Sequence, residues 1–224
     1  MGLLDSLKLS PEDKEARQNE KFMRMALKEA EKAFSINEVP IGCVIVKDGK
    51  VIAKGSNRRN KDRNVISHAE MMAISDACKK IHDWRLDDCT MYVTLEPCPM
   101  CAGAIVQARM KKVVIGTMNE KGGCAGSVIN LLNTPGLPQQ VETETGVLQS
   151  ECSEILSRFF QNLRDAKTTA KSNITAANED VAESSEAAAP EAAPAPDEPV
   201  PTEPTGDAMP KTPTTGTSEA DGVQ

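Results

Sequence analysis

The chain has 224 residues, which is room for one domain of ordinary size and an additional segment. Its formal charge of −7 is uneven, because residues 168–224 carry two lysines and eleven acidic residues while residues 1–167 are close to neutral. The acidic balance therefore belongs to the last segment and says little about the partner of the rest of the chain. No apolar run reaches the roughly 18 residues that a membrane-spanning helix needs.

The first part of the chain predicts a helix followed by a β-hairpin. Ser10 and Asp13 have the spacing of a capping box, and apolar residues at helical spacing then predict a helix over residues 10–37. Two β-branched, apolar runs follow at residues 39–47 and 50–56. An Asp-Gly pair separates them, and this pair is a strong signal for a turn between antiparallel strands.

Helices and strands then alternate along the chain. In order, we expect a basic loop at 57–64, a helix at 67–81, a strand at 90–95, a helix at 98–109, a strand at 112–117, a short helix at 127–133, a strand at 141–145 and a closing helix that ends near Arg164. Such alternation predicts an α/β layered domain.

The last part of the chain differs in composition. Residues 168–224 contain no leucine and no aromatic residue, but hold eight of the fourteen prolines. Because such a segment buries too little apolar surface to offset chain entropy, we interpret it as a disordered acidic tail. A solubilising role is the simpler interpretation, and docking of a protein partner is the alternative. We therefore expect a lead-in at 1–18, a folded domain at 19–167 and the tail at 168–224.

Three side chains have the chemistry of a metal site. Cys98 and Cys101 are three residues apart at the start of a predicted helix, and His68 lies at the start of another. Two thiolates and an imidazole are a ligand set that zinc prefers. His82 lies nearly four helical turns from His68, so it is too far away to complete the set. Three ligands with one open position indicate a catalytic zinc site rather than a structural one.

Glu70, two residues after His68, supplies a group that can move protons. A carboxylate beside a zinc-activated water is equipment for hydrolysis at an electrophilic carbon. A redox pair of the thioredoxin type is another interpretation of Cys98 and Cys101, but it leaves His68 and Glu70 without a role. The seven cysteines are odd in number and scattered, and no secretory signal precedes them, which predicts reduced thiols and a cytoplasmic protein.

Several motifs between residues 19 and 164 resemble a known family. The order H-x-E followed by P-C-x-x-C is the signature of zinc nucleobase deaminases. The segments EVPIGCVIV, SHAEMMAI, EPCPMCAGAI, KGGCAGSVINLLN and ILSRFFQNLR together resemble the bacterial-type tRNA-specific adenosine deaminases of the cytidine/deoxycytidylate deaminase superfamily. The first motifs are shared with cytosine and guanine deaminases, so the substrate depends on the segments from Gly122 onward.

The resemblance implies a fold and a reaction. The fold is a three-layer α/β/α cytidine-deaminase-like sandwich with a five-stranded mixed sheet. The reaction is hydrolysis of adenosine to inosine at the wobble position (34) of a tRNA anticodon loop, with one Zn²⁺ per subunit. His68, Cys98 and Cys101 would bind the zinc, and Glu70 would shuttle protons. The family also implies a homodimer in which the partner subunit helps to complete each site.

The resemblance further implies substrate contacts. Asn57 and the backbone of Ala69 would hold the target base, and Phe160 would lie near the neighbouring loop bases, although phenylalanines on a closing helix are more often core residues. Asn119 stands where the family commonly has an aspartate that contacts the ribose region, and this change can relax the preference for RNA. Two other functions stay open: deamination of free guanine or cytosine, and a catalytically silent, zinc-stabilised RNA-binding or adaptor protein.

Overall fold

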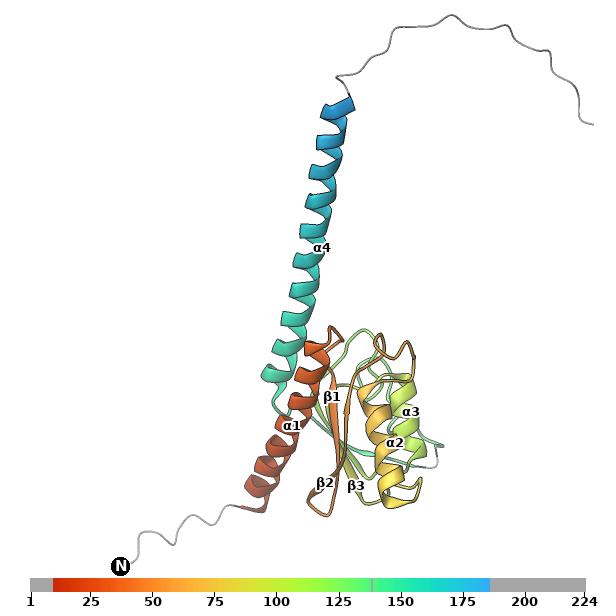
Figure 1. Cartoon of the computed structure of the whole chain (residues 1–224). Coiled ribbons are helices and arrows are strands. Elements are labelled where there is room, and N and C mark those ends of the chain that lie inside the picture. The colour runs from red at the N-terminus through yellow and green to blue at the C-terminus, as the bar shows by residue number, and fades with distance from the viewer. Residues whose placement is uncertain (1–9, 138, 186–224) are drawn as a thin grey trace, which may run out of the picture. The chain divides into compact units, whose positions relative to one another are not determined.

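The computed structural model describes residues 10–137 and 139–185, with side chains described as far as residue 169. In chain order the elements are α1 Pro11–Ser35, β1 Gly42–Lys47, β2 Lys50–Ser56, α2 Ala69–Ile81, β3 Cys89–Leu95, α3 Pro99–Gln107, β4 Lys112–Thr117, β5 Glu142–Thr145 and α4 Gln149–Ser185 (Figure 1). Within these ranges, no helix is both long and apolar enough to cross a bilayer.

The five strands form one mixed sheet in the order β2-β1-β3-β4-β5. β1 is antiparallel to both β2 and β3, whereas β4 is parallel to β3 and to β5. The hairpin predicted from the Asp-Gly pair joins β1 and β2, and Asp48 and Gly49 both have the positive φ that such a turn requires. The predicted five-stranded mixed sheet is confirmed.

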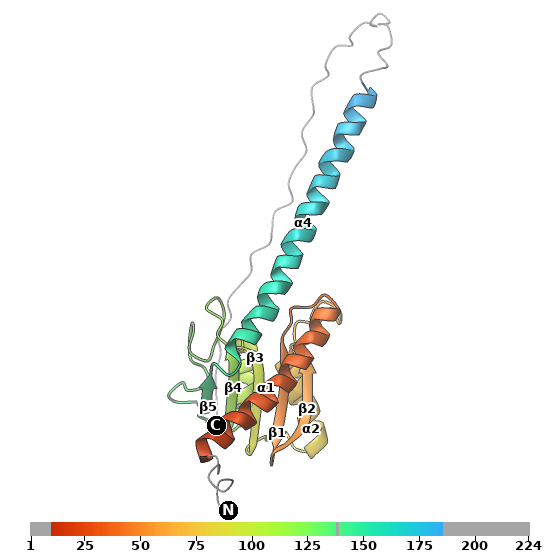
Figure 2. The ribbon, with the colours of Figure 1, turned by 90° about the vertical axis from the view of Figure 1, so that its left-hand side faces the viewer.

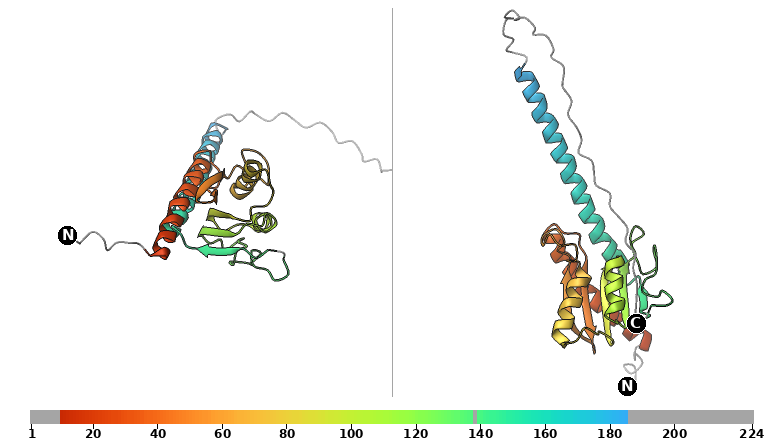
Figure 3. Two further views of the ribbon diagram at one scale, coloured as in Figure 1. Left: turned by 90° about the horizontal axis from the view of Figure 1, so that it is seen from below. Right: turned by 90° about the vertical axis from the view of Figure 1, so that its right-hand side faces the viewer.

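Helices cover both faces of this sheet, so the predicted three-layer sandwich is also confirmed. Alternate residues of β1 point to opposite faces, with Cys43 and Ile45 in the core on one side and Val44 and Val46 in the core on the other. The first core includes residues of α2 and α3, and the second includes residues of α1 and the start of α4. In the left view of Figure 3 the two pairs of helices lie on opposite sides of the strands.

The first helix begins as its sequence predicts. The Asp13 N–H donates to the Ser10 hydroxyl at 3.0 Å, and the Ser10 N–H donates to the Asp13 carboxylate at 3.3 Å, which completes the capping box. The helix buries Phe22, Met23 and Ala26 against the sheet. Figure 2 shows α1 lying across the strands, in agreement with its contacts to β1, β3 and β4.

Two element predictions are wrong. The segment 127–133 is not a helix, because its backbone turns back on itself in an isolated bridge between Ala125 and Asn130. The closing helix extends past Arg164 to Ser185, and this extension contains no proline that would end it. The first part of the segment expected to be disordered is therefore helical in the structure.

The proposed division into 1–18, 19–167 and 168–224 otherwise stays a prediction. α1 begins at Pro11, inside the expected lead-in, and the chain divides by its internal contacts into the units Met1–Ala176 and Ala177–Gln224. The rest of the acidic tail, residues 186–224, lies outside the described residues.

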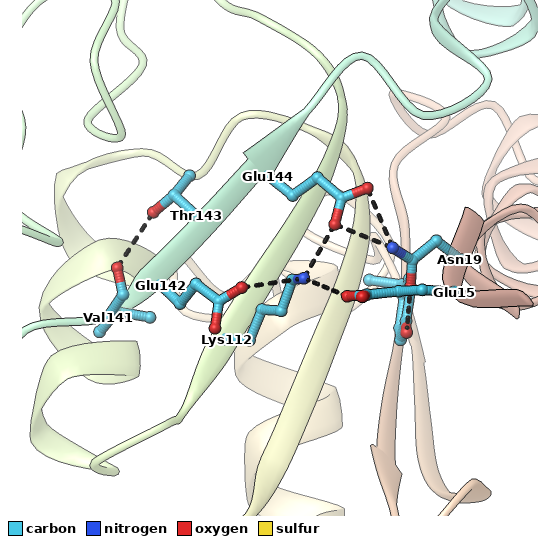
Figure 4. Close-up of polar contacts among 8 residues, drawn as sticks. Glu15, Asn19, Lys112, Val141, Glu142, Thr143 and Glu144 are labelled. Atoms are coloured by element: carbon cyan, nitrogen blue, oxygen red, sulfur yellow. Dashed lines mark hydrogen bonds and ion pairs between the residues drawn. The ribbon is translucent and has the colours of Figure 1, made fainter. Parts of the chain in front are cut away.

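A polar cluster ties β4 and β5 to α1. The Lys112 ammonium lies 2.9 Å from Glu15, 3.0 Å from Glu142 and 2.9 Å from Glu144 (Figure 4). Asn19 donates to Glu144 at 2.8 Å and accepts from the Tyr92 hydroxyl at 2.8 Å. The edge strand β5 is thus attached to the helical layer through charge as well as through its backbone ladder.

Lys112→Met is expected to lower the free energy of unfolding at neutral pH by about 1–2 kcal/mol. Methionine keeps the apolar part of the lysine side chain, so the loss of stability measures the contribution of the ammonium group that pairs with the three carboxylates. Denaturant unfolding of Lys112→Met beside Lys111→Ala, a change at an exposed lysine next in sequence, tests this prediction. Equal stability of the two variants would contradict it.

The cluster also predicts the direction in which the stability of the fold changes with pH. A hydrogen bond from Lys112 lowers the pKa of Glu15 below its ordinary value of 4.5. A carboxylate with a lowered pKa stabilises the fold above its ordinary pKa, and this contribution is lost as the pH falls from 4.5 through the lowered value. The stability difference between the wild type and Lys112→Met should therefore shrink in that range.

Candidate active site

His68 lies immediately before α2, one position earlier than the predicted first turn. It is the N-cap residue with extended backbone angles, φ −81° and ψ 155°. The start of α2 lies so close to β2 that a β-carbon on Gly55 would collide with the carbonyl oxygen of Ala69. Glycine at this position therefore lets the helix deliver His68 and Glu70 close to the sheet.

Cys98 is likewise an N-cap residue, and Cys101 follows in the first turn of α3. β3 ends at Leu95, so both cysteines lie beyond the carboxyl end of a central strand, where sites in parallel α/β sheets commonly form. The first helical position is Pro99, which is compatible with a helix start because that residue needs no N–H donor there.

The structure brings the three expected ligands together. His68 Nδ1 lies 3.7 Å from Cys98 Sγ and 3.6 Å from Cys101 Sγ, and the three ligand atoms lie within 4.8 Å of one another. His82, as the sequence indicates, is at the other end of α2. An imidazole and two sulfur atoms at this spacing fit a zinc ion, with a fourth position left for a non-protein ligand.

The two thiols differ in acidity. A hydrogen bond with Cys101 lowers the pKa of Cys98 to about 5, and the nearby His68 acts in the same direction. The same hydrogen bond, together with burial, raises the pKa of Cys101. Thiolate is the form that binds metal, and the lowered pKa of Cys98 favours that form.

Glu70 is the buried carboxylate beside these ligands. Its side chain is 3% exposed, and burial raises its pKa to about 7. In the part of the chain that the structure describes, its Oε2 is a buried oxygen without a hydrogen-bond partner. A buried polar atom without a partner is costly, so its retention here points to a role toward a bound molecule.

Asn57 is held by fixed contacts to the segment before β1. It is 5% exposed, and its amide nitrogen donates to the Val39 carbonyl at 3.2 Å and to the Glu38 carboxylate at 3.4 Å. Two acceptors around one atom identify it as the amide nitrogen. Ala69, the other residue expected to hold the base, is fully buried in the first turn of α2.

A cavity of about 620 Å³ contains the other two expected substrate contacts. It is lined by Val39, Leu95, Asn119, Lys121, Leu156, Ser157, Phe160 and Arg164. Phe159 is buried and packs against Phe34, whereas Phe160 is 44% exposed. The core interpretation of the phenylalanine pair therefore applies to Phe159, and Phe160 faces the cavity with Asn119.

Two buried carboxylates near the site were missed in the sequence. Glu38 is 1% exposed and accepts the Lys61 N–H at 2.6 Å, which holds the basic loop after β2. Glu96 is 2% exposed and accepts several donors from the loop after β4. The available signal was a glutamate close to a proline: Glu38 stands two residues before Pro40, ahead of β1, and Glu96 stands directly before Pro97, after β3.

Comparison with known proteins agrees with this geometry. The sequence model of the MafB19-like deaminase family matches residues 17–164. The chain is 49% identical over 158 residues to the tRNA-specific adenosine deaminase of Bacillus subtilis (strain 168), covering 70% of this chain and 98% of the relative. The chain belongs to the tRNA-specific adenosine deaminase family.

Other members of the deaminase family support the assignment. The tRNA-specific adenosine deaminase of Streptococcus pyogenes serotype M3 is 47% identical over 150 residues, covering 67% of this chain and 88% of that protein. A solved structure from work on A-to-I editing by tRNA:A34 deaminases at the wobble position of transfer RNA is 41% identical, with a TM-score of 0.59. It covers 61% of this chain and 99% of that chain, so almost the whole of that deaminase structure matches about three fifths of this chain.

Proposed function

We propose that this protein hydrolyses adenosine to inosine at the wobble position of a tRNA anticodon loop. The observation that carries the proposal is the grouping of His68, Cys98 and Cys101 around Glu70, whose Oε2 has no hydrogen-bond partner among the described residues. Relatives with 47–49% identity are named tRNA-specific adenosine deaminases. Water is consumed and ammonia is released, so the reaction needs no redox partner.

In this proposal His68, Cys98 and Cys101 hold one zinc ion per subunit. Zinc in such a ligand set acts as a Lewis acid and makes water a better nucleophile near neutral pH. Glu70 would accept a proton from the attacking water and return a proton to the amino group that leaves. Burial of Glu70 suits this exchange, because a carboxylate is an efficient acid and base when its pKa lies near the working pH.

The remaining contacts select the substrate. Asn57 and the backbone of Ala69 hold the target adenine, and Asn119 and Phe160 contact the neighbouring nucleotides in the cavity. Lys121 and Arg164 on the same cavity supply positive charge for phosphates. An unpaired anticodon base is displaced from its stack at low cost, which suits a reaction at a buried carboxylate.

The proposal includes a homodimer and a cytoplasmic location. Two pairs of apolar side chains are exposed on loops, Val65 with Ile66 and Val128 with Ile129. Exposed apolar pairs of this kind are typical of surfaces that a partner subunit covers. A tRNA substrate and free thiolate ligands both agree with a reducing cytoplasm.

The direct test is incubation of the protein with an anticodon stem-loop that carries adenosine at the wobble position. Sequencing should then report guanosine at that position, because inosine pairs as guanosine. A stem-loop with guanosine at the same position is the matched control and should be unchanged. Ammonia release from free guanine or cytosine alone would overturn the proposal in favour of a nucleobase deaminase, and no reaction with any substrate would favour a silent adaptor.

A further inference from the structure

The carboxylate of Glu96 is the centre of the loop that follows β4. It lies between β3 and α3, is almost fully buried, and accepts four hydrogen bonds. The donors are the N–H groups of Asn119 at 2.8 Å, Ala125 at 2.8 Å and Ser127 at 3.0 Å, and the Ser127 hydroxyl. In the described part of the chain these donors are loop N–H groups and a hydroxyl rather than a lysine or arginine, so the loop compensates the charge of Glu96.

We propose that Glu96 is a positioning residue that holds this loop, and Asn119 with it, in place for the target nucleotide. This inference rests on the proposed deaminase function. Glu96 acts through the loop and touches neither the reacting carbon nor its leaving group.

The loop is built around this carboxylate. A β-carbon on Gly123 would collide with the Glu96 carboxylate, so glycine is needed for the backbone to pass so close. The Cys124 N–H donates to the Pro97 carbonyl at 2.9 Å, which attaches the loop a second time, next to Cys98. The loop therefore takes its position from the same segment that delivers the metal ligand.

Each of the two carboxylate oxygens of Glu96 accepts two hydrogen bonds from the loop. Oε1 accepts the Ala125 and Ser127 N–H groups, and Oε2 accepts the Asn119 N–H and the Ser127 hydroxyl. The backbone of Asn119 is thus fixed by one oxygen, while its side chain lines the cavity that Phe160 shares. Because hydrogen bonds to a buried charge are stronger than neutral ones, this contact restricts where Asn119 can lie.

Glu96→Gln tests the inference with little change of volume. In glutamine an NH₂ group replaces one of the two oxygens and faces the donors of that oxygen. It is best tolerated at the position of Oε2, because the Ser127 hydroxyl can turn there to accept a hydrogen bond from it. The Asn119 N–H then loses its acceptor. We expect KM for the anticodon stem-loop to rise about tenfold, the effect of one lost charge-assisted hydrogen bond, with kcat within about threefold and zinc content unchanged.

Two further readouts separate positioning from general stability. Amide hydrogen exchange at residues 119–127 should become faster in Glu96→Gln, and Asn119→Ala combined with Glu96→Gln should raise KM no more than Asn119→Ala alone. Glu29→Gln is the matched control, since Glu29 is another carboxylate that is buried, 5% exposed, and paired with Lys32 on α1. It should leave KM and the exchange of the loop unchanged.

An unchanged KM and unchanged loop exchange in zinc-loaded Glu96→Gln would overturn the inference, and so would loss of zinc with a fall in kcat alone. If Glu96→Gln does not fold, Ser127→Ala removes one donor and leaves three, and unchanged loop exchange and KM in that variant would overturn the inference equally. Failure of the proposed function is distinguishable, because the wild type would then form no inosine while the exchange experiment still tests the loop.

Discussion

Glu70→Gln is expected to slow inosine formation by roughly 10²–10⁴-fold, the contribution of a positioned acid and base, while zinc remains bound. Glutamine has almost the same shape but neither accepts nor returns a proton at neutral pH. Because Glu70 Oε2 has no hydrogen-bond partner among the described residues, the substitution breaks no structural contact of that oxygen. Removal of a buried charge should, if anything, preserve the fold.

Single-turnover inosine formation on the anticodon stem-loop, beside metal analysis of the same sample, measures this effect. Glu29→Gln again serves as the control, since it makes the same chemical change at a buried carboxylate on α1. Turnover at the wild-type rate in Glu70→Gln would refute the assigned role of Glu70.

Cys98→Ala is expected to weaken zinc binding by more than about 100-fold. Loss of a residue that only orients a metal ligand costs up to about 100-fold in affinity, and loss of the ligand itself should cost more. Only His68 and Cys101 would remain as ligands from the group that the structure brings together. Activity should fall with the zinc content, and the melting temperature should also fall, because metal that binds the folded state stabilises it.

Zinc titration by competition with a chelator checks this prediction. Cys78→Ser is the matched control, because Cys78 is a partly buried cysteine whose thiol donates to the Trp84 carbonyl at 3.6 Å and does not belong to the ligand group. The control should bind zinc normally. Chelated wild-type protein should lose activity and regain it with added zinc, and full zinc occupancy in Cys98→Ala would contradict the assignment of this ligand.

Most secondary structure followed from local patterns, and the exceptions have tertiary causes. The capping box at Ser10 and the Asp-Gly turn act within a few residues, so they were readable without a fold. The run at 127–133 has helical spacing, yet it is not a helix, because Asn130 pairs with Ala125 in an isolated bridge and the Leu131 N–H donates to the Cys124 carbonyl at 2.9 Å. Pairing with the preceding loop residues replaced the hydrogen bonds that a helix would need.

The candidate site, too, was predictable from the sequence only in part. Residue types and spacing identified His68, Cys98, Cys101 and Glu70, because zinc requires those donors and helix starts can present them. Spacing could not show that Nδ1 of His68 lies 3.6–3.7 Å from both sulfur atoms, since this depends on how closely α2 approaches the sheet at Gly55. It also did not reveal the roles of Glu38 and Glu96, which hold loops rather than metal.

The sequence by itself determined the class of chemistry: a three-ligand zinc set with a carboxylate, resembling the tRNA-specific adenosine deaminases. The tertiary structure decided which charged groups are buried and what they hold. Glu70 has a buried oxygen without a hydrogen-bond partner among the described residues, whereas Glu96 has four donors, and both are glutamates beside a metal ligand in sequence. The difference is physical, because the cost of burying a carboxylate depends on the donors that the fold brings to it, and these lie far away along the chain.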